Sequence, residues 1–479
     1  MVKMGFNDRA LTFGTLFSVL CILYSIYRRD PTVDLQERLV RVINGLIQVE
    51  DQHITVTPKV VIGYGACVDL FVNAKDLLPY KDEIGFPEHF DNINSIDEFY
   101  KSFAYFFQHG AASERFMTNS TLFDTLIKDA EKLPDSRYEI GGNAPVMAIR
   151  LFHEGCDVTL ASTLTPKHLK SIPSGIKVVG ETVTRDDIHL ILEYKAQEKW
   201  GPYTAPRANR YILHNDQHNP YIRPLEALQE HLTQSSPDLF VVSALQLMDN
   251  YGYPVGVRTE RLKKIMKQIK SLPRKTKIHF EMASFTEEAL IKNLQEYIIP
   301  YVDSIGMNEQ ELANLYSVYK YGNISFVSDS RPRVAVVLDH MRSIFKILRS
   351  WSRLTIGTRR LNRIHVHTLA FQAILTTKDS PWKQNDVAAA KASLTAFRHV
   401  CDSSQVEAER ATVLMDDSFS LSLAGIEGRV WLKPEETPVP CWDEGDTNIC
   451  VAPGLVCKHA TKTAGGGDNI SAAALAVQL

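Results

Sequence analysis

Near its end the chain carries three glycines and an aspartate, Gly465, Gly466, Gly467 and Asp468, followed at once by an alanine-rich stretch typical of a helix. Glycines allow a backbone to approach a ligand closely. The first turn of a helix presents unpaired N–H groups and a partial positive charge, which suit a phosphate. Asp468 would then lie beside the group being transferred, where phosphoryl transfer needs a general base. An ordinary glycine-rich turn capped by an aspartate is the alternative.

A second glycine motif, at residues 141–145, precedes an apolar stretch at 146–152 that we expect to be helical. Gly142 and Asn143 could bind the hydroxyl groups of a ligand, one through its backbone N–H and the other through its side-chain amide. A plain helix start would use the same residues.

Two acidic residues occur where a metal ion could be bound. Alternation along a strand at 277–281 directs His279 and Glu281 to the same side. Asn308 and Glu311 have the spacing of a capping box at a helix start. The carboxylates of Glu281 and Glu311 could instead hold magnesium, partly through water, because that ion prefers oxygen ligands. For His279 and Glu281 the simpler interpretation is an ion pair at the strand end.

Five further polar residues are weaker candidates. Asp69 follows a glycine turn at the end of a strand, where it could bind a sugar hydroxyl or cap the next helix. Glu114 has the pattern of an exposed helix residue. Arg210 begins an apolar strand and could bind phosphate or a surface acid. His365 and His367 alternate along a strand, as core or strand-end histidines do. The chain has no Walker A motif, no protein-kinase motif set and no nucleophile elbow.

Apolar strands alternating with helices must position these residues. We expect strands at 59–69, 239–242, 277–281, 334–338 and 363–366, and helices at 35–49, 260–269 and 308–319. This alternation predicts an α/β fold with a mostly parallel central sheet flanked by helices. Ligands bind such sheets beyond the carboxyl ends of the strands. The less regular segments, about 70–120 and 180–215, are expected to form a smaller lid domain.

Composition narrows the class of protein. The chain has 479 residues, 44% of them hydrophobic, and a net charge of −3 without a long basic run, so nothing indicates nucleic-acid binding. Residues 11–27 are mostly apolar and are flanked by basic residues. We expect residues 1–30 to be a signal peptide or a membrane anchor, with residues 31–479 as the functional region.

Four motifs occur in the order found in ADP-dependent sugar kinases of the ribokinase-like superfamily, which the chain resembles. They are Gly-Gly-Asn-Ala at 141–144, His-x-Glu at 279–281, Asn-x-x-Glu at 308–311 and Gly-Gly-Gly-Asp at 465–468. Segments at 111–116, 191–194, 208–212, 306–312 and 455–458 are similar to the animal glucokinases of that family. The resemblance runs from about residue 55 to the C-terminus. One departure lies at 63–67, Gly-Tyr-Gly-Ala-Cys, where the family's sugar-binding turn has an asparagine.

The resemblance implies a ribokinase-like large domain with a lid, and the reaction of D-glucose with ADP to give glucose 6-phosphate and AMP, with magnesium. It implies that Asp468 is the general base and that Arg210 reaches the phosphates. The remaining implied roles are phosphate or nucleotide binding by Gly465, Gly466, Gly467, His365 and His367, magnesium binding by Glu281, Glu311 and Asp468, and sugar binding by Asp69, Glu114, Gly142 and Asn143.

The resemblance also implies a monomer associated with the endoplasmic reticulum or the secretory pathway, and secreted if the leader is cleaved. It further implies a disulfide between Cys401 and Cys457, with Cys441 and Cys450 as the alternative pair. A phosphofructokinase that uses ADP is the enzymatic alternative, but the carboxylate of Glu114 would repel a phosphorylated sugar. A catalytically silent sugar- or nucleotide-binding protein of the endoplasmic reticulum is the alternative outside enzymes.

Overall fold

A computed structural model describes the protein at residues 15, 17–19, 31–53, 56–324, 329, 331–351, 357–462 and 464–479. Within these ranges no helix is both long and apolar enough to cross a membrane. The stretch expected to be a signal peptide or an anchor, residues 1–30, lies outside the described residues except at 15 and 17–19. That expectation therefore stays a prediction.

A ten-stranded sheet forms the centre of the larger part of the molecule, in the order β20-β21-β16-β15-β14-β13-β12-β1-β6-β7. The strands from β15 to β7 run parallel, and β16, β21 and β20 add an antiparallel edge. The bounds are β1 (Lys59–Gly63), β6 (Asp157–Ala161), β7 (Lys177–Val179), β12 (Leu239–Val242), β13 (Lys277–Glu281), β14 (Ser304–Asn308), β15 (Arg363–His367), β16 (Phe371–Thr377), β20 (Cys441–Glu444) and β21 (Thr447–Pro453). The expected mostly parallel α/β sheet is confirmed.

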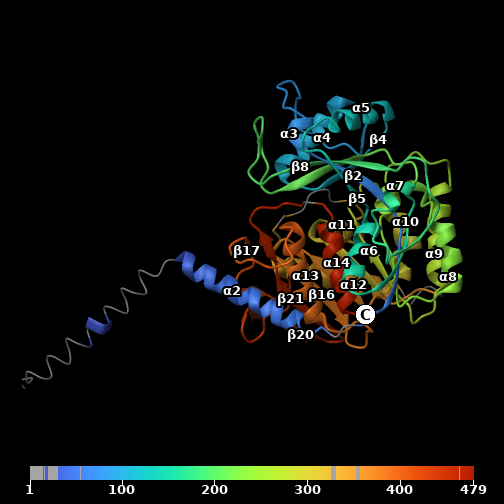
Figure 1. Ribbon diagram of the computed structural model, residues 1–479. Coiled ribbons are helices and arrows are strands. Elements are labelled where there is room, and N and C mark those ends of the chain that lie inside the picture. Colours follow the sequence, from blue (N-terminus) through green and yellow to red (C-terminus); the bar gives the residue numbers. More distant parts are fainter. Residues whose placement is uncertain are drawn as a thin grey trace, which may run out of the picture.

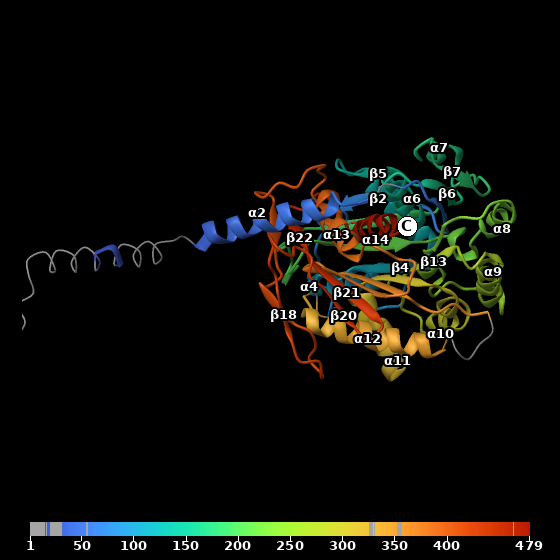
Figure 2. The same cartoon turned by 90° about the horizontal axis from the view of Figure 1, so that it is seen from below.

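Helices cover both faces of this sheet (Figure 2). One layer contains α2 (Pro31–Glu50), α6 (Asn143–His153), α13 (Asn385–Val400) and α14 (Gly466–Val477). The other contains α8 (Leu225–Gln234), α9 (Val257–Ser271), α10 (Glu288–Tyr297), α11 (Glu309–Tyr321) and α12 (Val334–Trp351). Successive side chains of β12 point to opposite faces of the sheet and pack against different helix layers. Leu239 packs with α6 and α14, while Phe240 packs with α9 to α12.

A smaller six-stranded sheet lies above the large one in Figure 1, in the order β3-β4-β11-β8-β2-β5. Its strands are β2 (Cys67–Asn73), β3 (Asn92–Ile93), β4 (Ser113–Met117), β5 (Arg137–Gly141), β8 (Ile188–Tyr194) and β11 (Asn209–His214), with α3 (Ala74–Leu77), α4 (Ile96–His109) and α5 (Ser120–Ala130). An aromatic core that includes Phe103, Phe107 and Trp200 holds it together. The segments expected to form a lid, about 70–120 and 180–215, supply most of the strands of this sheet. The helix α5 and the strand β5 belong to the same region but lie outside those segments. Their action as a lid stays a prediction.

The remaining elements are short. They are α7 (Pro166–Leu169), β9 (Lys199–Trp200), β10 (Tyr203–Thr204), β17 (Ala411–Val413), β18 (Ser418–Ser420), β19 (Arg429–Trp431), β22 (Leu455–Cys457) and the 3₁₀ turns Asn219–Tyr221, Leu245–Met248 and Ile299–Tyr301.

Three local expectations are wrong. Residues 334–338 begin the long helix α12, in which Met341, Ile344 and Leu348 continue the buried apolar face at helical spacing. The segment 59–69 is not one strand, because β1 ends at Gly63 and β2 begins at Cys67 in the other sheet, which places Asp69 within a strand. Glu114 lies on β4 and not on a helix.

Candidate active site

The glycine motif forms the N-terminus of α14. Gly465 caps the helix with a φ of 68°, a conformation that glycine adopts without strain. A Cβ atom on Gly467 would lie 2.8 Å from Cε1 of His367, so the ring requires a glycine there. Gly466 has more room, since the nearest atom to such a Cβ, on His399, is 4.0 Å away. Asp468 follows in the first turn of the helix.

The second glycine motif brings α6 against α14. Gly142 has a φ of 87°, and a Cβ atom there would lie 2.5 Å from the backbone oxygen of Gly65. Asn143 begins α6 and donates a hydrogen bond from Nδ2 to Oδ1 of Asp468 at 2.8 Å. Gln246 donates from Nε2 to Oδ1 of Asn143 at 2.9 Å, which orients the asparagine amide. Sequence reasoning missed Gln246, which lies in an apolar run without a motif.

Asp468 has the protonation behaviour of a general base near neutral pH. Burial and the nearby negative charge of Glu281 raise the pKa of Asp468 to about 7, against the opposing hydrogen bond from Asn143 and the positive charges of His367 and Arg210. A base whose pKa lies close to the operating pH can accept a proton from a hydroxyl group and release it again.

Glu281 is held by a chain of hydrogen bonds inside the large sheet. His279 bonds through Nε2 to Oε2 of Glu281 and through Nδ1 to Oγ of Ser304, each at 2.8 Å. Arg363 donates to the same Ser304 oxygen at 3.0 Å. On the neighbouring strand, a Cβ atom on Gly306 would lie 2.4 Å from Oε2 of Glu281, so glycine leaves the space for this carboxylate. The chain fixes the direction of the Glu281 side chain.

The charges of the acidic residues fit a bound cation. Burial opposes ionisation of Glu281, but the hydrogen bond with His279 and the nearby imidazole of His367 lower its pKa to about 2. Burial raises the pKa of Glu311 to about 7, and the charge of Glu281 adds to this. A dication would favour the ionised form of each of these carboxylates.

Direct coordination by all three acidic residues is not the geometry observed. Both carboxylate oxygens of Glu311 already accept hydrogen bonds from Asn308, at 2.9 and 2.8 Å, and complete the expected capping box. Among the described residues, the groups of three close metal-ligand atoms lie elsewhere, in the small sheet and just after it. Glu281, Glu311 and Asp468 therefore fit magnesium held partly through water, as magnesium commonly is.

The two histidines of β15 have different surroundings. Nε2 of His367 lies 3.9 Å from Oε1 of Glu281, and the ring faces Gly467. The negative charge of Glu281 raises the pKa of His367 although burial opposes it. His365 is fully buried, and burial holds its pKa well below the usual range, so the ring is neutral. Its expected role beside the nucleotide stays a prediction.

The small sheet contributes an acidic cluster around one histidine. Asp69 on β2 lies opposite His189 on the neighbouring strand β8. Nδ1 of His189 is 3.5 Å from Oε1 of Glu114, and Nε2 is 3.1 Å from Asp216. Burial opposes protonation of His189, but these carboxylates raise its pKa to about 10. Burial raises the pKa of Asp69 to about 6. The alternation of segment 188–194 was the signal that could have identified His189 as inward-facing.

Arg210 is the second residue of β11, which begins at Asn209. One of its guanidinium nitrogens, Nη1, donates to Oδ1 of Asn209 at 3.3 Å, while Nε is buried and makes no hydrogen bond within the described protein. Its positive charge lowers the pKa of Asp468. A buried donor without a partner is costly, and an anionic ligand between the two sheets would satisfy it.

Residues of the small sheet, together with loop and helix residues of the large domain, line two small pockets. One pocket is lined by Glu114 and His214 from the small sheet together with Gln246, Asp249 and Thr286 from the large domain. The other has Arg115 on one side and Glu311 on the other. Gln246 connects the first pocket to the base, because it holds Asn143, which in turn holds Asp468.

Four cysteines are placed in two pairs. The sulfur atoms of Cys401 and Cys457 lie within bonding distance, with their Cα atoms 5.5 Å apart. Those of Cys441 and Cys450 do so as well, with a Cα separation of 4.1 Å. The second pair was expected as an alternative to the first, but the two pairs use different residues and are placed together.

Comparisons with known sequences indicate one family. Residues 58–477 match the sequence model of a family described as the ADP-specific phosphofructokinase/glucokinase conserved region. An ADP-dependent glucokinase from Bos taurus is 31% identical over 422 residues, covering 87% of this chain and 84% of that protein. A probable ADP-dependent glucokinase from Caenorhabditis elegans is 28% identical, covering 98% of this chain and 95% of that protein.

A solved structure, described as an ADP-dependent kinase complex with fructose-6-phosphate and ADPβS, resembles the fold. Its TM-score is 0.65 at 18% identity, and the match covers 92% of this chain and 97% of that one. At this level of identity the likeness shows the fold alone.

Proposed function

The chain belongs to the ADP-specific phosphofructokinase/glucokinase family, and from this premise we propose that it transfers the β-phosphoryl group of ADP to D-glucose, giving glucose 6-phosphate and AMP. The observation that carries the proposal is the position of Asp468, a carboxylate with a pKa of about 7 in the first turn of α14, hydrogen-bonded to the residue that begins α6. The use of ADP as donor follows from the family and from the names of the relatives.

Asp468 would accept the proton of the sugar 6-hydroxyl as its oxygen attacks the phosphorus. Asn143 holds Oδ1 of Asp468, which leaves Oδ2 for the hydroxyl. The N–H groups of residues 465–468 and the positive end of α14 stabilise the charge on the transferred phosphoryl group. Arg210 supplies the unpartnered Nε donor from the small sheet. Positioning and charge neutralisation of this kind supply most of the catalysis in phosphoryl transfer.

Magnesium is proposed as the cation near Glu281 and Glu311, where it would neutralise phosphate charge when bound. The burial of both carboxylates, and the rise that the charge of Glu281 causes in the pKa of Glu311, support this assignment. Closure of the small sheet over the cleft would exclude water, which otherwise competes with the sugar hydroxyl.

Glucose is favoured over a phosphorylated sugar by the charge of the small-sheet pocket. Asp69, Glu114 and Asp216 lie around His189, and His214 is 3.3 Å from Asp216. Three carboxylates therefore face two histidines, and the cluster has an excess of negative charge. Carboxylates bind sugar hydroxyls well but repel a sugar phosphate. This charge, together with the glucokinase names of the relatives from Bos taurus and Caenorhabditis elegans, supports glucose over fructose 6-phosphate as the acceptor.

We further propose that the protein enters the endoplasmic reticulum through its N-terminal 30 residues and carries both disulfides there. Seven cysteines, four of them placed in two pairs, suit an oxidising compartment. Mass spectrometry of unreduced peptides should recover both pairs, and a fusion lacking residues 1–30 should lose its reticular location. Reduced Cys401 in protein purified from that compartment would contradict the pairing.

The assay that tests the function measures AMP and glucose 6-phosphate with ADP, magnesium and glucose, and repeats it with ATP. We expect one AMP for each glucose 6-phosphate, and little turnover with fructose 6-phosphate. Turnover with ATP alone would contradict the donor. Glucose binding without turnover of either nucleotide would favour a silent binding protein.

A further inference from the structure

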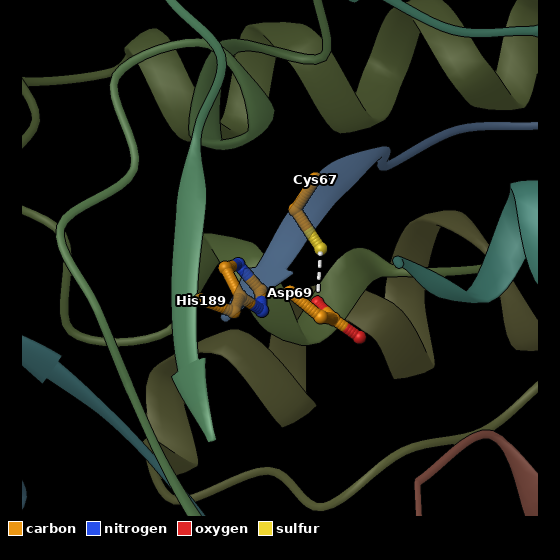
Figure 3. A group of neighbouring side chains, drawn as sticks. All are labelled: Cys67, Asp69 and His189. Carbon is orange, nitrogen blue, oxygen red and sulfur yellow. Dashed lines mark hydrogen bonds between the residues drawn. The ribbon is translucent and has the colours of Figure 1, made fainter. Parts of the chain in front are cut away.

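Cys67, Asp69 and His189 bring a thiol, a carboxylate and an imidazole together in the small sheet (Figure 3). Their ligand atoms all lie within 4.8 Å of one another, and all three residues are buried. Strand geometry explains the cluster. Cys67 and Asp69 are two residues apart on β2 and share a face, and Asp69 is opposite His189 on the parallel neighbour β8. Gly141, opposite Cys67 on β5, leaves space for the Asp69 carboxylate.

Existing hydrogen bonds orient these three groups toward a ligand. The thiol of Cys67 donates to Oδ1 of Asp69 at 3.1 Å. Nε2 of His189 lies 3.1 Å from both oxygens of Asp216, so Nδ1, which faces Glu114 at 3.5 Å, is the ring nitrogen that would bind a cation. A carboxylate that holds the distal N–H of a histidine is the usual support of a metal-binding imidazole, because it fixes the tautomer and raises the basicity of the ring.

The charge of the surroundings favours a cation. Burial and the charges of Asp69, Asp216 and Glu114 raise the pKa of the Cys67 thiol well above its usual value. The same negative charges surround His189, the only basic group in the cluster of Cys67, Asp69 and His189. A divalent cation would replace the proton of the thiol and the proton of the imidazolium, and both protons would pass to solvent. No oxidation or reduction is involved.

We propose that Cys67, Asp69 and His189 form an inhibitory site for a thiophilic divalent cation of the zinc class. Sulfur, nitrogen and oxygen ligands together suit zinc, and three protein ligands leave a fourth position for water. Magnesium would not compete, since it selects oxygen ligands. The inhibitory effect rests on the proposed function, in which Asp69 binds the sugar, so that cation and glucose exclude each other.

Cobalt(II) provides a direct test that does not depend on kinase activity. Titration of the purified full-length protein with Co²⁺ should produce the near-ultraviolet charge-transfer absorption of a thiolate–cobalt bond, and glucose should suppress it. The substitution Cys67→Ser should abolish the band. The matched control is Cys156→Ser, because among the described residues Cys156 is the other buried free cysteine, and it lies outside the cluster. This control should retain the band.

Kinetic measurements connect the site to the reaction. Zn²⁺ should raise the KM for glucose and leave kcat unchanged, and Cys67→Ser should raise the inhibition constant at least about tenfold. A cobalt band that persists in Cys67→Ser, or its absence from the wild-type protein, would overturn the site. A band suppressed by glucose in a protein without kinase activity would keep the site and contradict the proposed function instead.

Discussion

Asn143 and Asp468, 325 positions apart in the chain, are joined by a hydrogen bond of 2.8 Å between the first turns of α6 and α14. The bond connects the helix start suited to sugar hydroxyls with the helix start suited to phosphate. It also decides which oxygen of Asp468 is available to the substrate. The alignment of sugar, base and phosphoryl group thus depends on how these two helices pack.

Removal of this bond should affect the chemical step. In Asn143→Ala the carboxylate of Asp468 loses a charge-assisted partner worth about 1.5–3 kcal/mol, so kcat should fall about 10- to 100-fold. Steady-state kinetics with glucose and ADP measures this change. Asn94→Ala, at an exposed position of the small-sheet region, is the matched control and should keep wild-type kcat. An unchanged kcat in Asn143→Ala would remove the asparagine from the catalytic arrangement.

Gly466 and Gly467 differ in how much space surrounds them, which allows a paired test of the glycine loop. Gly467→Ala would place a Cβ atom 2.8 Å from the ring of His367, whereas the nearest atom for Gly466→Ala is 4.0 Å away. We expect Gly467→Ala to lower kcat/KM for ADP at least about tenfold, because displacing reacting groups by about 1 Å can cost two orders of magnitude. Gly466→Ala should be much milder. Equal losses of kcat/KM in the two variants would show that contact with His367 does not determine the conformation of the glycine loop.

Acceptor choice should depend on Glu114. Its carboxylate lies beside His189 in the pocket between the sheets. Glu114→Gln should lower kcat/KM for glucose about 10- to 100-fold through the loss of a charged hydrogen-bond partner, and should narrow the preference for glucose over fructose 6-phosphate. Competition assays with both sugars measure the ratio. If the ratio stays the same, some other group excludes the phosphorylated sugar.

The position of the C-terminal helix α14 should depend on its C-cap residue, Gln478. Gln478 accepts a hydrogen bond of 2.6 Å from Nε of Arg363, a fully buried arginine. Gln478→Ala leaves that charged donor unsatisfied, and the free energy of unfolding should fall by about 1.5–3 kcal/mol. Denaturant unfolding measures the loss, and Gln217→Ala at an exposed site is the control. A change as small as that of the control would show that packing alone anchors α14.

A half-buried ion pair predicts how stability depends on pH. Burial opposes ionisation of Glu50, but Arg398 and Lys391 lower its pKa below the value in the unfolded chain. The ionised pair therefore stabilises the fold above the unfolded pKa, and this contribution is lost as the pH falls below about 4. Glu50→Gln should be less stable than wild type at pH 7, with the difference disappearing in acid. A difference in stability between the two proteins that does not shrink as the pH falls would contradict the assignment.

Much of the scaffold could be predicted because local pattern and tertiary role agree. The strands at 239–242 and 277–281 have the predicted bounds, since strands buried on both faces are continuous apolar runs. The run at 334–338 misled because five apolar residues are compatible with either a strand or a helix, and the deciding residues come later in α12.

The residues of the candidate site also fall into two groups, those that the sequence predicts and those that it does not. Asp468 and Asn143 belong to motifs with a local physical meaning, and the structure brings them together. Gln246 and His189 have no such motif. Their importance comes from strands and turns that meet only in the folded chain, and single-sequence patterns do not contain that information.

The substitution Asp468→Asn tests the central claim most directly, since it keeps the shape of the side chain and removes the base. Glucose binding by calorimetry and AMP formation from ADP should be measured on the same preparation. The account predicts that kcat falls about 10²- to 10⁴-fold, while the dissociation constant for glucose stays nearly unchanged. Wild-type turnover in Asp468→Asn would contradict the role of Asp468 as the general base.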